Sequence, residues 1–287
     1  MKHELRSSGY DWGKSNPAVL EVETLGKSFG ELLIITDVTF GVHSGEFVAV
    51  LGPSGAGKTT LFRCIAGLIA PSDGRVRVRG ADTRGLRRRQ RCDIAVVFQQ
   101  FNLIGRRSAL GNVLAGRLGQ VSAWRGMSGR FSREDKLWAL ECLDRVGMLD
   151  HAERRADTLS GGQQQRVAIA RAIAQRPGVI LADEPVSSLD PQTSRDVLDL
   201  LRDICRKERV AVVSSLHQVD LARACADRIV GLANGRVVID IAAPDFDAAA
   251  FTTVYGTAAE GGAIADGTGT AVATEFSYDA ERGFMAS

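Results

Sequence analysis

The 287-residue sequence lacks several features that would each point to a particular class of protein. It contains no run of about 20 apolar residues, so no membrane-spanning helix is expected, and its charged N-terminal stretch does not resemble a signal peptide. Its five cysteines are scattered without a CxxC pair, which argues against a zinc module or a disulfide framework and fits a reducing compartment. With 45% hydrophobic and 24% charged residues, the chain is expected to be a globular protein, either cytosolic or bound to a membrane through a partner.

Charge is unevenly distributed along the chain, although the net charge is only +2. The segment 241–287 carries seven acidic residues and one arginine, a net charge of −6, so the preceding residues carry +8. Because this segment also has little apolar content, we expect 242–287 to be an acidic, disordered C-terminal tail. Residues 1–17 are polar and aperiodic and are expected to form a flexible extension, which leaves 18–241 as the folded domain.

Short apolar runs alternate with helix-periodic segments, a pattern typical of an α/β fold. The runs predicted to be buried strands are 46–51, 93–98, 179–182 and 210–214. Helical periodicity is clearest over 135–146 and 163–175, and Asn234-Gly235 between two apolar runs predicts a hairpin.

A phosphate-binding loop, or P-loop, follows the first of these predicted strands. The pattern GxxxxGK[ST] is carried by GPSGAGKT, and the residues expected to contact a nucleotide are Gly52, Pro53, Ser54, Gly55, Ala56, Gly57, Lys58, Thr59 and Thr60. In such a loop the glycines let backbone N–H groups surround a phosphate, and the following helix N-terminus adds its dipole. Lys58 is expected to reach the β- and γ-phosphates and the Thr59 hydroxyl to bind Mg²⁺. Because a strand precedes the motif and a helix follows it, an ordinary glycine-rich turn is the weaker interpretation.

Two acidic residues, Asp183 and Glu184, follow the apolar run VILA. A carboxylate at a strand end can hold Mg²⁺ opposite Thr59, and a second one can polarise an attacking water. Such a pair alone is more often a solvated turn. Together with a P-loop it predicts a Walker B element, with Asp183 at the metal and Glu184 at the water.

A second candidate phosphate site precedes the helical run that begins near residue 163. It is the sequence LSGGQ, which places Ser160, Gly161, Gly162 and Gln163 at a helix start suited to an anion. Two such sites in one chain require either one large ligand or two chains that meet face to face. With this motif the sequence resembles the ATP-binding cassette (ABC) ATPases. The resemblance implies that the signature of one subunit closes over the ATP held by the P-loop of a second copy.

The resemblance covers about residues 20–240 and includes four further motifs. Phe29 in KSFG matches the aromatic residue that stacks on adenine. Gln99 in VVFQQF matches the Q-loop glutamine that senses Mg²⁺ and the attacking water, with the adjacent Gln100 as an alternative assignment. Asp190 matches the D-loop aspartate that crosses the dimer interface, and His217 matches the H-loop histidine at the γ-phosphate.

From this family we expect a P-loop NTPase (RecA-like) core with an antiparallel β subdomain and an inserted α-helical subdomain. The implied cofactors are ATP and Mg²⁺, with Thr59, Gln99 and Asp183 at the metal. The implied catalytic residues are Glu184, His217 and Gln99, acting in metal-assisted phosphoryl transfer to water.

The variable segments resemble the ATP-binding subunits of phosphonate importers in particular. The stretches that carry this resemblance are FQQFNLIGRRSALGNVLAGRLG, ADTLSGGQQQRVAIARA and DEPVSSLDP. They imply a position on the cytoplasmic face of the inner membrane, with integral membrane permease subunits as partners and a substrate-binding protein as an indirect one. Phosphite and phosphate stay open as substrates, and importers of polar amino acids, which share FQxFNL-type Q-loops, are the nearest alternative.

Two arginine-rich stretches raise the alternative of nucleic-acid binding. In RVRVR at 75–79 the alternation predicts an antiparallel strand with its valines inward, and the arginines of 84–91 are interpreted as a solvated connection. Cassette ATPases that act on chromosomes or ribosomes carry long coiled coils, zinc modules or a second cassette, and this sequence has none of these. We therefore expect no nucleic-acid partner, because the basic excess also suits ATP phosphates and an anionic membrane surface.

Overall fold

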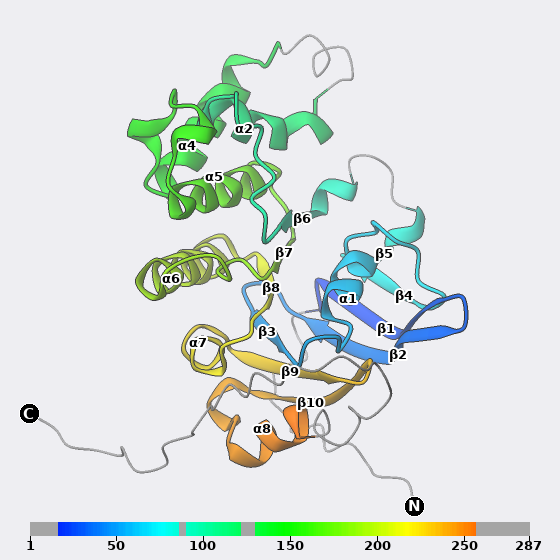
Figure 1. The fold of residues 1–287 in the computed structure, drawn as a ribbon. Helices are drawn as coiled ribbons and strands as arrows, with labels where there is room; N and C mark the ends of the chain where they lie inside the picture. Colours follow the sequence, from blue (N-terminus) through cyan, green and yellow to red (C-terminus); the bar gives the residue numbers. More distant parts are fainter. Residues whose placement is uncertain (1–16, 86–89, 122–129, 257–287) are drawn as a thin grey trace, which may run out of the picture.

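The computed structural model describes residues 17–85, 90–121 and 130–256. In these residues a six-stranded sheet lies beside a four-stranded antiparallel sheet, and helices pack on both faces of the larger sheet (Figure 1). The predicted α/β fold is therefore confirmed. The N-terminal extension, apart from Pro17, and residues 257–287 of the expected tail lie outside the described residues.

The larger sheet has the strand order β10-β9-β3-β8-β7-β6. Its strands are β3 (Phe47–Leu51), β6 (Ile94–Val97), β7 (Val179–Asp183), β8 (Ala211–Ser215), β9 (Arg228–Ala233) and β10 (Arg236–Ala242). All neighbours pair in parallel except β9 and β10, which form the hairpin predicted at Asn234-Gly235. Strands β3 and β8 are buried along their whole length, which explains why they appear in the sequence as continuous apolar runs.

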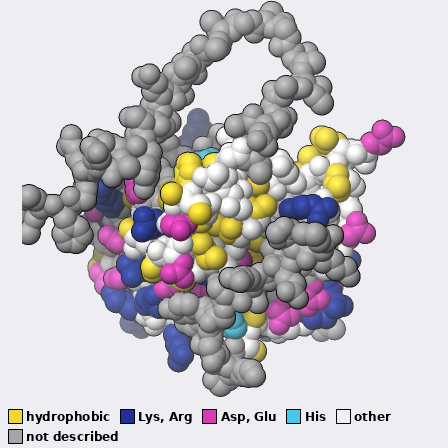
Figure 2. Space-filling view, turned by 90° about the horizontal axis from the view of Figure 1, so that it is seen from below, with side chains coloured by type: hydrophobic (Ala, Val, Ile, Leu, Met, Phe, Trp, Pro, Cys, Tyr) yellow, Lys and Arg dark blue, Asp and Glu magenta, His cyan; other side chains and the backbone are white. Residues whose placement is uncertain are grey.

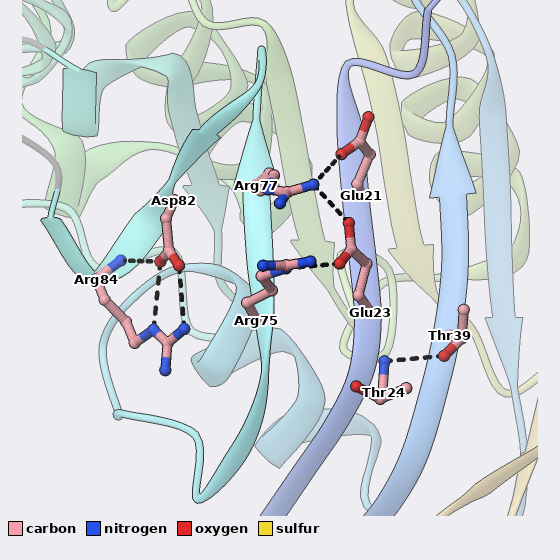
Figure 3. Close-up of polar contacts among 8 residues, drawn as sticks. All are labelled: Glu21, Glu23, Thr24, Thr39, Arg75, Arg77, Asp82 and Arg84. Atoms are coloured by element: carbon pink, nitrogen blue, oxygen red, sulfur yellow. Dashed lines mark hydrogen bonds and ion pairs between the residues drawn. The ribbon is translucent and has the colours of Figure 1, made fainter.

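The smaller sheet has the order β2-β1-β4-β5. Its strands are β1 (Leu20–Phe29), β2 (Leu32–Val42), β4 (Asp73–Val78) and β5 (Ala81–Asp82). Val76 and Val78 of β4 are buried, while Arg75 and Arg77 form ion pairs with Glu23 of β1 (Figure 3). The arginine-rich stretch is thus the half-buried strand that its alternation predicts, and neighbouring glutamates balance its charge.

Helix α1 (Lys58–Ile65) lies between the two sheets. Its Leu61, Phe62 and Ile65 share one buried core with apolar side chains from both sheets. The loop that leads into α1 is therefore placed where the two sheets meet.

The remaining helices before β9 cover the other face of the larger sheet or extend beyond it. They are α2 (Ala109–Ala115), α4 (Arg133–Arg145), α5 (Gly161–Ala174), α6 (Pro191–Glu208) and α7 (Val219–Cys225), with short 3₁₀ turns η1 (Thr83–Gly85), η2 (Gln90–Asp93), η3 (Gly116–Gly119), η4 (Leu149–His151) and η5 (Ala156–Thr158). Helices α2, α4 and α5 pack on one another as a helical subdomain between β6 and β7 in the chain, at the top of Figure 1. Ser132 and Ser160 each begin a helix with a reciprocal capping box, which fixes the starts of α4 and α5.

The C-terminal part of the described chain differs from the sequence-based expectation. Residue 242 was expected to begin a disordered tail, but the structure forms η6 (Ala243–Asp245) and α8 (Ala248–Tyr255) there, with Phe246 and Val254 buried. A Cβ atom on Gly231 of β9 would lie 2.5 Å from Val254 Cγ2, so α8 packs directly on the sheet. Most of the acidic residues follow Gly256, while the segment before it carries apolar residues that reach the core, so the charge of 242–287 as a whole gave the wrong boundary. Within the described residues, regular structure therefore continues past residue 242 as far as Tyr255.

Helix α8 lies at the lower side of the molecule in Figure 1, and Figure 2 views this side directly. Hydrophobic side chains are exposed near the centre of this face, and charged side chains lie mostly around them (Figure 2). Within α8, Phe251 is 48% exposed and its ring stacks on Tyr255 with a centroid distance of 4.7 Å. The helix thus has one buried side and one apolar exposed side.

Candidate functional site

Four strands of the larger sheet bring polar residues to one edge. The P-loop follows β3, Asp183 ends β7, His217 follows β8 by two residues, and Gln99 follows β6 by two residues. Asp183 pairs with Ser215, the last residue of β8, and Ser215 pairs with Val50 near the end of β3. Because parallel strands end at the same edge, motifs that lie far apart in the sequence meet there.

The P-loop passes close to β9 and ends at the start of α1. A Cβ atom on Gly52 would lie 2.1 Å from the carbonyl oxygen of Leu232, so this position accepts only glycine. Gly57, with a φ of +100°, precedes α1, and within the described residues no side chain caps this helix and no acidic residue lies in its first turn. The N–H groups at the start of α1 therefore suit an anionic ligand such as a phosphate.

Lys58, the first residue of α1, folds back across this loop. Its Nζ donates hydrogen bonds to the carbonyl oxygens of Gly52 at 2.6 Å and Pro53 at 3.1 Å. Burial lowers the pKa of Lys58, and the carboxylates of Glu184 and Asp183 oppose this shift. A buried ammonium group whose hydrogen bonds go to neutral carbonyls is well placed to exchange them for phosphate oxygens.

Asp183 and Thr59 offer the oxygen atoms that Mg²⁺ prefers. Thr59 is exposed in the first turn of α1, and Asp183 Oδ1 accepts a 2.8 Å hydrogen bond from the Ser215 hydroxyl. Burial raises the pKa of Asp183, and this hydrogen bond opposes the shift. Among the described residues there is no group of three or more His, Cys, Asp or Glu side chains that could enclose a metal. One carboxylate and one hydroxyl instead fit Mg²⁺, which usually completes its shell with phosphates and water.

Glu184 adopts a backbone conformation that is uncommon for a residue with a side chain, with a φ of +49°. Its amide donates a 2.8 Å hydrogen bond to Ser215 Oγ, and its Oε1 lies 2.6 Å from His217 Nε2. Glu184, His217 and Ser215 line one small pocket, together with Leu216 and Leu221. The structure therefore brings two of the predicted catalytic residues, Glu184 and His217, into direct contact.

Ser215 is a site residue that the sequence interpretation missed, because the run VAVVSS was considered only as a buried strand. A signal was available, since two adjacent serines end an otherwise apolar run and successive residues of a strand point to opposite faces. Ser214 and Ser215 are both fully buried. The Ser214 hydroxyl has no hydrogen-bond partner within the described residues, whereas the Ser215 hydroxyl has two.

The predicted signature and D-loop residues meet on another surface. A Cβ atom on Gly162 would lie 2.5 Å from Thr193 Cγ2, so the start of α5 packs tightly on α6. Asp190 caps α6 by accepting a 3.0 Å hydrogen bond from the Thr193 amide, and hydrogen bonds from Thr193 lower its pKa. One depression is lined by residues from both motifs, namely Ser160, Gly161, Gly162, Gln163, Arg166, Ser188, Leu189, Asp190, Thr193 and Asp196. The structure describes all of the P-loop residues, and none of them lines this depression. The two predicted phosphate sites of one chain are therefore separate.

Phe29 ends β1 with an exposed ring, 53% accessible, over which Lys27 Nζ lies at 4.8 Å from the centroid. It pairs with Leu32 of β2, and a Cβ atom on Gly57 would lie 3.1 Å from the Ile34 carbonyl oxygen. The β1–β2 hairpin thus runs beside the P-loop at Ile34, and Phe29 lies near the turn of this hairpin.

The two candidate Q-loop glutamines, Gln99 and Gln100, are both exposed after β6. Their exposure is compatible with either assignment, so the choice of Gln99 stays a prediction from the motif.

This combination of a parallel sheet, a P-loop at the start of α1 and two acidic residues at the end of β7 defines a P-loop ATPase. A family model for the ABC transporter matches residues 35–187, more than half of the chain. The chain belongs to the ABC transporter family, and it is an ATP-binding and ATP-hydrolysing cassette. The predicted resemblance to ABC ATPases is confirmed.

Within the family, the chain is similar to ATP-binding proteins of phosphorus-compound importers. The chain is 54% identical over 215 residues to the phosphonates import ATP-binding protein PhnC of Thiobacillus denitrificans, covering 75% of this chain and 83% of that protein. It is 52% identical over 225 residues to the hypophosphite import ATP-binding protein HtxD of Stutzerimonas stutzeri, covering 77% of this chain and 66% of that protein.

Solved cassette structures share the fold. The dimeric structure of a post-hydrolysis state of the ATP-binding cassette MJ0796 bound to ADP and Pi is 36% identical with a TM-score of 0.66, covering 78% of this chain and 98% of that chain. A second dimeric structure of MJ0796, a bacterial ABC transporter cassette, is 34% identical with a TM-score of 0.68 and has the same coverage. None of the helices in the described ranges has the length and hydrophobicity needed to cross a bilayer.

Proposed function

We propose that this chain is the ATPase of an importer of phosphonates or a related phosphorus oxyanion. The observation that carries the proposal is the identity of 52–54% to the ATP-binding proteins of a hypophosphite importer and a phosphonate importer. The substrates of both are small oxyanions of phosphorus, so the similarity supports a substrate class rather than one compound.

The P-loop holds the phosphates of ATP in this proposal. Lys58 exchanges its hydrogen bonds to Gly52 and Pro53 for oxygens of the β- and γ-phosphates, and the uncapped start of α1 contributes backbone N–H groups. The exposed ring of Phe29 stacks on the adenine beside the same loop.

Thr59, Gln99 and Asp183 would hold Mg²⁺ in this proposal. When bound, the ion neutralises charge on the phosphates and stabilises the transferring phosphoryl group. Asp183 is fixed for this role by its hydrogen bond from Ser215.

Glu184 orients the attacking water and accepts its proton, and His217 stabilises the γ-phosphate. Their 2.6 Å contact supports this assignment, because it allows His217 to fix the direction of the Glu184 carboxylate before a nucleotide binds.

The active assembly is a head-to-tail dimer in which each ATP lies between the P-loop of one copy and the signature of the other. Support comes from the depression that Ser160 and Asp190 share, which is separate from the P-loop of the same chain. The similar cassette named above, MJ0796, is dimeric in both of its structures. ATP binding closes this dimer and hydrolysis reopens it, which would move a partner between two conformations.

Integral membrane permease subunits are the partners we propose, with a substrate-binding protein delivering the substrate to them. Three large apolar residues of the helical part of the chain are exposed, Ile104 before α2, Leu137 on α4 and Leu149 in η4. Exposed apolar residues of this kind suit a docking surface for a partner. Docking there places the chain on the cytoplasmic face of the cell membrane.

Growth after gene deletion tests the proposed substrate class. The deletion strain is expected to lose growth on a phosphonate, hypophosphite or phosphite as the sole phosphorus source and to retain growth on polar amino acids as the sole nitrogen source. Complementation with the wild-type gene should restore growth, and complementation with Glu184→Gln should not. A strain that loses growth only on an amino acid would refute the proposal in favour of an amino acid importer.

A further inference from the structure

Ser215 lies between the two acidic residues of the site. Its hydroxyl donates to Asp183 Oδ1 at 2.8 Å and accepts from the amide of Glu184 at 2.8 Å. The residue is fully buried at the end of β8. One hydroxyl group therefore joins the side chain of one acid to the backbone of the next.

The direction of both hydrogen bonds follows from the groups involved. A backbone N–H group can only donate, so the Ser215 oxygen must accept from Glu184, and its own proton is then available for Asp183. Because Ser215 engages Oδ1, the orientation of the whole Asp183 carboxylate is fixed, and Oδ2 is the oxygen not used by this bond. A carboxylate fixed in this way is preorganised to bind a metal.

The same hydroxyl also supports the unusual backbone of Glu184. Residues with a side chain adopt a φ near +49° at an energetic cost and keep it only where their surroundings hold them. The Ser215 hydroxyl accepts a hydrogen bond from the amide of Glu184. The carbonyl oxygen of Glu184 accepts a 3.1 Å hydrogen bond from the Ser187 hydroxyl. With the backbone fixed on both sides, the Glu184 carboxylate reaches His217.

We propose that Ser215 is a positioning residue for ATP hydrolysis, which orients the metal-binding carboxylate of Asp183 and the backbone of Glu184 through a single hydroxyl. The inference rests on the roles proposed above for these two acids. Ser215 acts through them and needs no contact of its own with the nucleotide.

The chain contains a closely matched control for this residue. Ser214 precedes Ser215 in the same strand and is equally buried, but its hydroxyl has no hydrogen-bond partner within the described part of the chain. Removing either hydroxyl deletes the same atom from the same strand, and only at Ser215 does this remove a hydrogen bond from the Asp183 carboxylate and one from the Glu184 amide. A comparison of the two alanine variants therefore separates positioning from a general effect of altering β8.

The experiment compares the purified full chain with Ser215→Ala, Ser214→Ala and the isosteric pair Ser215→Thr and Ser215→Val. Steady-state ATPase assays over a range of ATP and Mg²⁺ concentrations give kcat, KM and the Mg²⁺ requirement. Binding of a fluorescent ATP analogue is measured separately with Mg²⁺ and with EDTA, and thermal unfolding reports on the fold.

Loss of the Ser215 hydroxyl is expected to lower kcat about 10- to 100-fold, the usual effect of removing a group that orients a metal ligand. Ser215→Ala and Ser215→Val should also need more Mg²⁺ and lose most of the gain in analogue binding that Mg²⁺ provides. Binding in EDTA should stay unchanged. Ser215→Thr should restore much of the activity because it keeps the hydroxyl, and Ser214→Ala should match the wild type.

Two results would overturn the inference. One is a Ser215→Ala or Ser215→Val variant with wild-type kcat and Mg²⁺ requirement. The other is an equal loss in Ser215→Thr and Ser215→Val, which shows that the size of the side chain matters and the hydroxyl does not. Failure of the proposed Mg²⁺-dependent hydrolysis is distinguishable, because the wild-type chain itself would then show no Mg²⁺-dependent ATPase activity. Failure of the proposed substrate class is read from the growth test and leaves the comparison of the Ser215 variants unaffected.

Discussion

Replacing Phe246 by alanine tests whether the chain beyond β10 is an integral part of the cassette. Phe246 is 2% exposed and belongs to the core that also includes Ile229 of β9 and Val254 of α8. Truncating a buried phenylalanine to alanine costs about 3–5 kcal/mol, because contacts are lost and a cavity remains. Since whole domains have unfolding free energies of about 5–15 kcal/mol, Phe246→Ala is expected to remove a large part of the stability.

Phe251 provides the matched control in the same segment. Its ring is 48% exposed and its main contact is the stack on Tyr255, so Phe251→Ala should cost about 1 kcal/mol or less. Urea unfolding followed by circular dichroism measures both variants, and a difference of about 2 kcal/mol or more is expected. Because β9 pairs with β3 next to the P-loop, Phe246→Ala should also weaken ATP binding. Equal and small effects of the two substitutions would refute the reasoning and return the domain boundary to residue 241.

Three further predictions concern the site. Lys58→Ala should weaken binding of a fluorescent ATP analogue at least about tenfold, since charged hydrogen bonds to phosphate are lost, and unchanged affinity would contradict the role of Lys58. Glu184→Gln and His217→Ala should each reduce steady-state kcat strongly. Because the two side chains are in contact, the double variant should lose little more activity than either single variant. Fully additive losses would show that the two residues act independently. Asp190 has a lowered pKa, so the stability it provides is present at neutral pH and lost as the pH falls below about 4. Asp190→Ala should therefore reduce the acid dependence of unfolding, and an unchanged pH profile would argue against this.

Much of the fold could be predicted because its signals are local. Strands buried on both faces, such as β3 and β8, appear as continuous apolar runs, and α4 and α5 show helical spacing with a serine at the start of each. The P-loop and the acidic pair at the end of β7 were also accessible, because each motif contains in one stretch the residues that its chemistry needs.

The contacts that hold the site together could not be read from the sequence. The bond between Glu184 and His217 and the bridge through Ser215 join adjacent strands, and they depend on the register that pairs Asp183 with Ser215. A shift of one residue would direct Ser214 to the site in place of Ser215, and no local pattern excludes this. The predicted C-terminal boundary was wrong for a related reason. Phe246 is buried against residues that lie elsewhere in the sequence, such as Ile229 of β9, and the average composition of 242–287 does not reveal one buried residue.

The depression lined by the signature and D-loop residues is separate from the P-loop of the same chain, so the rate of hydrolysis depends on mass action between two chains. In the proposed dimer a single chain carries two halves of different sites and no complete one. Hydrolysis by the free chain is then second order in protein at low concentration, and its rate falls with the square of dilution. A permease that binds two copies would remove this dependence by raising their effective concentration. The membrane partner would thus switch on the ATPase simply by bringing two copies together.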